Sequence, residues 1–161
     1  MKLRTFCLFT LLAAMQTLAA FGLGAQNPAQ HYALNVKDFS ELCVVDGINV
    51  DYVCMPDSAG YAVFDARPEV ASQIMFEPSG GKLKVQLASR DVDVDRLPTV
   101  RVYSRYLTSV ENSGDSLVRV LSLAPGPKFK ATLMGNGRLS VRGVDANEAS
   151  AVLATGNGQL V

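Results

Sequence analysis

A short pattern written three times in the second half of the chain decides the fold: SGDSLV at 113–118, GNGRLS at 135–140 and GNGQLV at 156–161. With Leu117, Leu139 and Leu160 aligned, the copies lie about 22 and 21 residues apart, a period typical of the stacked coils of a solenoid. Glycine permits positive φ and close approach of one coil to the next. We therefore expect five structural corners to stack: Gly114, Gly135, Gly137, Gly156 and Gly158.

Apolar residues alternate with polar ones on either side of these corners. In the second copy, the apolar set 129, 131 and 133 precedes the corner, and Leu139 and Val141 follow it. Such alternation is the signature of a half-buried strand. In the first copy Leu117 aligns with the leucines of the other two copies, but the alternation places Val118 and Val120 on the apolar side of the strand. This shift by one residue predicts a bulge there.

The rest of the chain from residue 32 onward also indicates β structure. Short extended segments at 42–45, 48–54, 61–65 and 82–87 are separated by turn residues such as Asp46-Gly47. Pro68 occupies a favourable first helical position and predicts one short helical turn near 68–74, which we expect the Pro-Ser-Gly-Gly stretch at 78–81 to end. We predict an all-β solenoid with that single turn.

The N-terminus predicts export. A cationic start, MKLR, precedes an apolar run at 5–24, and cleavage after Ala25 would leave no transmembrane segment; an uncleaved anchor is the alternative. The predicted division is a signal peptide at 1–25, a lead-in at 26–38 and one domain at 39–161. Because Val161 lies inside a repeat, we expect either a truncated C-terminal end or an end covered by another subunit.

The charge balance limits the classes of partner, and the cysteines raise the question of a disulfide. The 15 basic and 15 acidic residues balance, and loss of Lys2 and Arg4 with the signal leaves a net charge of about −2, so we expect no nucleic-acid partner. Cys43 and Cys54 would remain after cleavage in a compartment that permits disulfides. They either form a bridge or pack as small buried hydrophobes, and strand parity favours the second.

The order of motifs resembles a known family. The segments are FSEL at 39–42, GINV at 47–50, GKLKV at 81–85, VRVY at 100–103 and LTSVENSG at 107–114. Together they resemble the GIN-domain family of exported bacterial proteins, labelled putative autotransporter adhesin heads and common in Bacteroidetes-type bacteria. The resemblance covers 39–161 and implies a right-handed β-helix-like fold of short parallel coils. It also implies location in the periplasm, at the outer-membrane surface or outside the cell, and an adhesive role, with no catalytic residues.

The best candidate binding patch is Arg101, Tyr103, Arg105 and Tyr106. Guanidinium groups and phenol rings can pair carboxylates, stack on sugars and donate to hydroxyls. The alternative is a solvated face whose rings only cover the coil below.

Three alternating acids, Asp91, Asp93 and Asp95, would project about 7 Å apart on one face of an extended strand. They are weak candidates for calcium, and a charged, solvated edge is the favoured interpretation because a glycine turn and a distal acid are missing. His31 is the single histidine and has no visible partners for a catalytic triad. We therefore expect no catalytic residue, cofactor or resident metal.

These features favour a non-enzymatic binding or adhesion module of the cell envelope, with a glycan or surface protein as partner. One alternative is a polysaccharide-active enzyme that uses Asp91, Asp93 and Arg101 in a groove. Another is a structural envelope protein that associates with copies of itself as a homo-oligomer.

Overall fold

The computed structural model describes residues 27–89 and 91–161, so the predicted signal peptide lies outside the described residues. The strands are β1 (Gln30–Asn35), β2 (Glu41–Val44), β3 (Val50–Cys54), β4 (Tyr61–Ala66), β5 (Ile74–Ser79), β6 (Lys82–Leu87), β7 (Val100–Ser104), β8 (Ser109–Asn112), β9 (Leu117–Ser122), β10 (Gly126–Met134), β11 (Arg138–Val141), β12 (Ala146–Thr155) and β13 (Gln159–Leu160). One α-helical turn, α1 (Pro68–Ala71), and two 3-10 turns, η1 (Pro56–Ser58) and η2 (Val94–Arg96), complete the described part. The predicted all-β character is confirmed.

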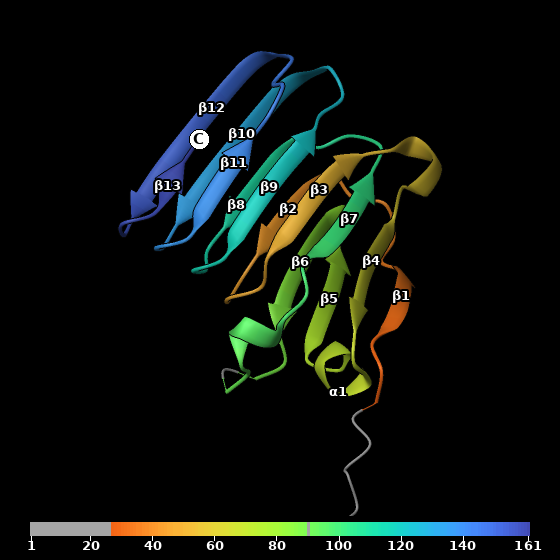
Figure 1. The fold of residues 1–161 in the computed structure, drawn as a ribbon. Helices are drawn as coiled ribbons and strands as arrows, with labels where there is room; N and C mark the ends of the chain where they lie inside the picture. Colours follow the sequence, from red (N-terminus) through yellow and green to blue (C-terminus); the bar gives the residue numbers. More distant parts are fainter. Residues whose placement is uncertain (1–26, 90) are drawn as a thin grey trace, which may run out of the picture.

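The strands form two mixed sheets that face each other (Figure 1). Sheet A has seven strands in the order β1-β4-β7-β3-β9-β11-β13, and sheet B has six in the order β12-β10-β8-β2-β6-β5. Neither sheet closes on itself, so the fold is not a closed barrel. The interior lies between the sheets, where the largest fully buried side chains are Tyr52, Leu42, Ile48, Leu83, Leu133 and Leu139.

Five pairs of strands that follow each other in the sequence place their first strand in sheet B and their second in sheet A. These pairs are β2 and β3, β6 and β7, β8 and β9, β10 and β11, and β12 and β13. We call each pair a rung. Neighbouring rungs are hydrogen-bonded in parallel on both sheets. The Asp46-Gly47 turn therefore connects two sheets rather than two paired strands.

The order of the rungs in space differs from their order in the sequence. The first rung, β2 and β3, lies between the second and the third. Residues that face each other across the first and third rungs are consequently 68 positions apart. The intervening chain also supplies β4 and β5, which pair antiparallel to β7 and β6, while β1 pairs antiparallel to β4. This antiparallel part closes one end of the stack.

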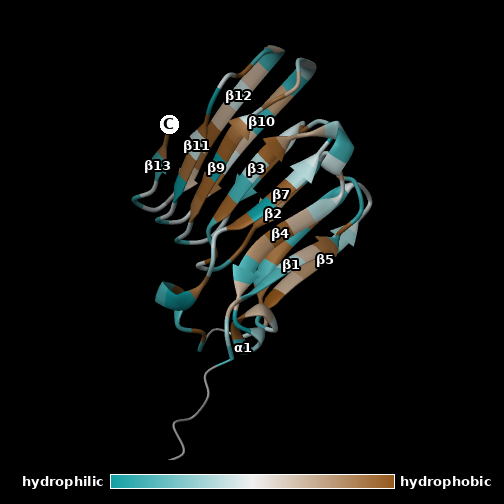
Figure 2. Ribbon diagram, turned by 45° about the vertical axis from the view of Figure 1, so that its right-hand side comes forward, coloured by the Kyte–Doolittle hydropathy of each residue, from teal (hydrophilic) through white to brown (hydrophobic). Residues whose placement is uncertain are grey.

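The predicted alternation within strands is confirmed. In β10, Phe129, Ala131 and Leu133 are buried, whereas Lys130 is exposed and Thr132 is half-buried. Figure 2 shows brown apolar stretches on the strands interrupted by teal polar residues, with more teal at the turns. Period-2 patterning works here because each rung buries only one side of each of its strands.

At the corners the chain of one rung lies directly on the chain of the next. A Cβ on Gly114 would overlap the carbonyl oxygen of Asp46, and one on Gly137 would lie 2.5 Å from the carbonyl oxygen of Ser116. A polar ladder runs beside these contacts: Asp115 accepts from the backbone N–H of Asn136, whose side chain accepts from that of Asn157, each step spanning 21 residues.

The register corrects the alignment of the first repeat. Leu139 pairs with Val118 and Leu160, not with Leu117, so the first copy keeps the apolar parity and needs no bulge at its corner. Matching identical leucines favoured the wrong position, because the interior accepts any apolar residue of suitable size. Irregularities lie elsewhere, between Tyr52 and Val53 opposite β9, and between Leu133 and Met134 opposite β12.

The helical turn predicted near 68–74 is present as α1, but it ends at Ala71 and β5 begins at Ile74. Strand β5 was not predicted from the sequence; it contains Pro78 and pairs antiparallel to β6. Proline is tolerated in β5 because that strand lies at the edge of sheet B, where a missing N–H breaks no ladder on its free side.

Candidate functional site

The outer face of sheet A carries a row of polar side chains across its strands. The register places Val63 of β4 opposite Arg101 of β7, Arg101 opposite Asp51 of β3, and Asp51 opposite Arg119 of β9. Two arginines therefore flank one aspartate, although the three residues come from three separate rungs. The neighbouring inward residues Val50, Tyr52, Val100 and Val102 are fully buried, which fixes the outward direction of this row.

Asp51 and Arg119 form a bidentate ion pair. Arg119 donates from Nε to Oδ1 over 2.6 Å and from Nη2 to Oδ2 over 2.7 Å. The Asp51 side chain is 4% exposed, whereas that of Arg119 is 43% exposed. Hydrogen bonding to the Asp51 carboxylate, and then its charge, raise the pKa of the Arg119 guanidinium. Both oxygens of Asp51 are thus occupied, while part of the guanidinium still faces solvent.

Arg101 lies on the other side of Asp51 and is exposed. Its side chain makes no ion pair or hydrogen bond with any residue in the described ranges. Tyr103, two positions further along β7, points to the same outer side and is half-buried. A cation without a partner beside a partly exposed ring is the arrangement that a ligand with a negative charge and an apolar face would use.

These residues line a cavity of about 350 Å³ on sheet A. Its wall also includes His31 of β1 and Asp65 of β4, which face each other in the register and are joined by a contact of 2.8 Å between Nδ1 and Oδ1. Both side chains are largely exposed, at 64% and 72%. The described residues that line it are His31, Asp51, Val63, Phe64, Asp65, Thr99, Arg101, Tyr103 and Arg119. We call it the sheet-A cavity.

The predicted patch is only partly assembled. Arg101 and Tyr103 line the sheet-A cavity, but Arg105 and Tyr106 do not. The strand ends at Ser104, whose buried hydroxyl is hydrogen-bonded to the Tyr106 carbonyl over 2.9 Å, and the chain turns away there. Arg105 instead pairs with Asp38 over 3.5 Å.

Sequence reasoning missed His31, Asp51, Asp65, Thr99 and Arg119 as members of the site. One signal was present: Asp51 stands between Val50 and Tyr52 in an otherwise apolar strand, and a buried acid requires a partner. Its partner was not visible because Arg119 is 68 residues away.

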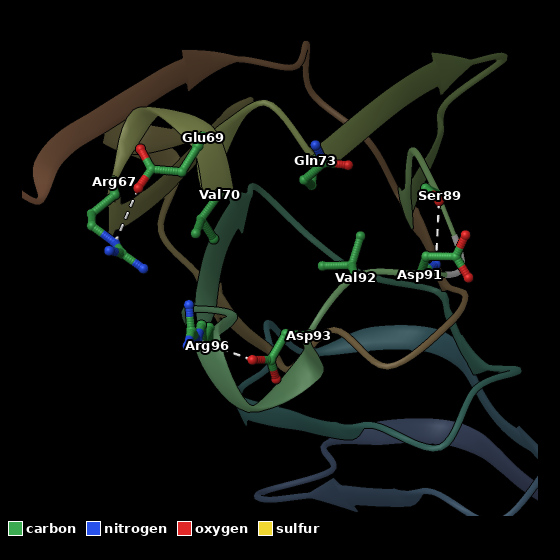
Figure 3. A pocket seen from close by; sticks show the side chains of 9 residues that line it. All are labelled: Arg67, Glu69, Val70, Gln73, Ser89, Asp91, Val92, Asp93 and Arg96. Atoms are coloured by element: carbon green, nitrogen blue, oxygen red, sulfur yellow. Dashed lines mark hydrogen bonds and ion pairs between the residues drawn. The ribbon is translucent and has the colours of Figure 1, made fainter. Parts of the chain in front are cut away.

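A second cavity, of about 510 Å³, lies between α1 and η2 (Figure 3). The two arginines among its described lining residues already contact acids: Arg67 lies 3.3 Å from Glu69, and Arg96 lies 3.0 Å from Asp93. Arg101 is absent from its lining. The groove of Asp91, Asp93 and Arg101 that we considered for an enzyme is therefore not assembled, since these residues line two different cavities.

The extended strand expected at Asp91, Asp93 and Asp95 is wrong. Asp93 caps the 3-10 turn η2 by accepting from the Asp95 backbone N–H, and Asp91 lies beside Ser89 (Figure 3). The acids thus follow a turn and do not project from one face. Within residues 27–89 and 91–161, no three His, Cys, Asp or Glu side chains are grouped to hold a metal ion.

Cys43 and Cys54 are both free thiols. Cys43 lies in sheet B and donates to Glu111 over 3.7 Å, whereas Cys54 lies in sheet A and donates to the Arg105 carbonyl over 3.1 Å. Burial, and then the nearby Glu111 charge, raise the pKa of the Cys43 thiol, so Cys43 resists forming a thiolate.

No helix among the described residues has the length and apolar character needed to cross a bilayer.

A search of the curated proteins finds no significant match. Solved structures share the fold. A putative adhesin from Parabacteroides distasonis gives a TM-score of 0.70 at 16% identity, with 83% of this chain and 57% of that chain covered.

Two further solved structures are similar at the level of fold. A putative adhesin from Parabacteroides merdae gives a TM-score of 0.57 at 16% identity, covering 71% of this chain and 52% of that one. A putative lipid binding protein from Parabacteroides distasonis gives a TM-score of 0.53 at 15% identity, with 70% of this chain and 48% of that chain covered. The chain thus spans about half the length of these proteins. The sequence model described as "Putative auto-transporter adhesin, head GIN domain" matches residues 38–161, and the chain belongs to that family.

Proposed function

We propose that this protein is an exported, non-enzymatic adhesion module that binds its target at the sheet-A cavity. The observation that carries the proposal is Arg101, an exposed cation without a partner among the described residues, placed beside Tyr103 in a cavity of about 350 Å³. The family is named for adhesion, which agrees with a binding surface rather than a catalytic one. The partner is a glycan or a surface protein.

The proposed architecture is a right-handed β-helix built from the five rungs. Parallel neighbours on both sheets support it, because a connection between parallel strands of one sheet is right-handed in nearly all proteins. In such a stack the interior is filled by side chains, so the outer faces are the surfaces left for binding.

The state of Asp51 supports a role without catalysis. Polysaccharide-cleaving enzymes generally need two carboxyl groups that can exchange protons with the substrate. Asp51 has both oxygens engaged by Arg119 and is buried, so it is unsuited to that work. Release of reducing sugars from a polysaccharide panel would contradict this part of the proposal.

A glycan array tests the proposed function. The purified protein is compared with the double variant Arg101→Ser, Tyr103→Ser and with Arg142→Ser, a matched control whose exposed arginine follows β11 outside the cavity. We expect binding by the original protein and the control, and loss of binding in the double variant. Binding that survives in the double variant would overturn the proposal, as would absence of binding to both glycans and surface proteins.

Self-association is the second candidate, and a specific observation favours it. An apolar cavity of about 210 Å³ lies at the β12 and β13 end of the stack, lined by Phe129, Val141, Leu160 and neighbouring residues. Leu153 of β12 is 53% exposed. Unpaired strand edges with apolar side chains promote association between copies. Concentration-dependent sedimentation, lost on Leu153→Lys, would support this role, and a monomer at all concentrations would exclude it.

A further inference from the structure

We propose that the sheet-A cavity recognises a sugar that carries a carboxylate group, with Arg101 as the residue that binds the carboxylate. This inference rests on the proposed function and adds the chemical class of the ligand. It concerns an acidic sugar unit, such as a uronic acid, within a larger glycan.

The first step is the distribution of charge in the cavity. Among the described residues, its lining holds two arginines, two aspartates and His31, and each aspartate already has its own partner. Arg119 occupies both oxygens of Asp51, and His31 contacts Asp65 over 2.8 Å. Arg101 is thus the charged residue of the described lining that no oppositely charged or hydrogen-bonding side chain contacts. A ligand carboxylate at Arg101 supplies that missing contact, whereas a neutral sugar offers it hydroxyl groups alone.

The second step is the reason why Arg101 is left over. Asp51 lies between the two arginines in the register, so either guanidinium could have neutralised it. It binds Arg119 in a bidentate geometry, which takes one acceptor site on each oxygen, and Arg101 makes no bond to it. Asp51 therefore fixes Arg119 and at the same time does not neutralise Arg101.

The third step is shape. The planar fork of a guanidinium matches the two oxygens of a carboxylate, which gives direction as well as attraction. Tyr103 stands on the same outer side of β7, where its ring can cover the apolar face of a sugar. Thr99 and the remaining donors of Arg119 are available for hydroxyl groups. The volume of about 350 Å³ lies at the small end of ligand pockets, which suits one or two sugar rings.

Calorimetric titration tests the ligand class with three probes of equal length: a galacturonic acid trimer, a neutral galactose trimer and a sulfated galactose trimer. We expect the carboxylated trimer to bind best. Arg101→Gln should weaken its binding roughly tenfold or more, because one charge-assisted bidentate contact is lost. Arg101→Lys should restore only part of that affinity, since lysine keeps the charge and loses the fork. Arg142→Gln should change nothing.

Removing an acid from the cavity gives an independent readout. Asp65 is exposed, so Asp65→Asn keeps the fold and removes a negative charge close to the site. We expect this variant to raise the affinity for the carboxylated trimer relative to that for the neutral trimer several-fold at low salt. A structural role for Asp65 would not produce that difference.

The outcomes separate the two proposals. Preference for the neutral or the sulfated trimer, or an unchanged affinity in Arg101→Gln, overturns the inference about carboxylates. If no trimer binds but a glycan or protein on the array binds through Arg101 and Tyr103, the adhesion proposal stands and the inference fails. If the double variant also binds the array as well as the original protein does, both proposals fail.

Discussion

Replacing Gly137 with alanine tests the close stacking of corners on which the fold rests. Gly137 lies between β10 and β11, and a Cβ there would be 2.5 Å from the Ser116 carbonyl oxygen, 2.6 Å from that of Gly114 and 2.8 Å from Asn112 Nδ2. Its φ is outside the left-handed region, so alanine meets no intrinsic backbone penalty. Any loss of stability therefore reports on the contact between successive rungs.

The expected magnitude follows from these distances. Ordinary contacts begin at 3.4 Å, so the corner must move by several tenths of an ångström away from two backbone oxygens. That movement lengthens the bond from the Arg138 backbone N–H to Ser116, now 2.9 Å, and disturbs buried Asn112, which donates to the same carbonyl over 2.9 Å. Overpacking costs about 1–3 kcal/mol and a weakened buried hydrogen bond about 1 kcal/mol. We expect a net loss of about 2–4 kcal/mol.

Urea unfolding followed by circular dichroism measures this loss, with Gly126→Ala as the matched control. Gly126 also has ordinary φ, and its added Cβ would meet only the Ala124 carbonyl oxygen, at 3.9 Å. The control should change the unfolding free energy by about 1 kcal/mol at most. Equal midpoints for the two variants, with equal slopes, would refute the stacked corners.

Three further predictions concern buried polar groups. In an Arg101→Gln background, which removes the other neighbouring guanidinium, Arg119→Ala should cost about 3 kcal/mol in urea unfolding because it leaves Asp51 buried without a cationic partner. Asp51→Ala should cost less, since Arg119 can turn to solvent. Burial raises the pKa of Tyr52 to about 12. The unfolded chain loses this proton first, so stability is full below about pH 10 and falls by roughly 2–3 kcal/mol toward pH 12; a Tyr52→Phe variant with the same pH profile would contradict this. Thiol labelling without reductant should detect Cys43 and Cys54 after denaturation, and Cys43 should react slowly in the native protein.

Much of the local structure follows from the sequence because each strand has one buried and one outer side. The alternation around Phe129 and Leu133 predicted the burial found in β10, and Pro68 predicted the helical turn. The order of the rungs did not follow. It depends on which strand edges pair across 68 residues, and the parity of a single segment carries no information about that pairing.

The candidate site shows the same difference between what alternation along one strand predicts and what the pairing of strands decides. Parity along one strand was sufficient to place Arg101 and Tyr103 on the outer face, because both belong to β7. It could not show that Asp51 and Arg119 lie beside them, since those residues belong to β3 and β9. A binding surface on stacked rungs is assembled across strands, so its members share a position within the rung and not a motif in the chain. The residues that form a binding site in this protein therefore lie in one row across neighbouring strands. A search for function should first compare residues at the same register position in neighbouring rungs, and only then compare segments of the sequence.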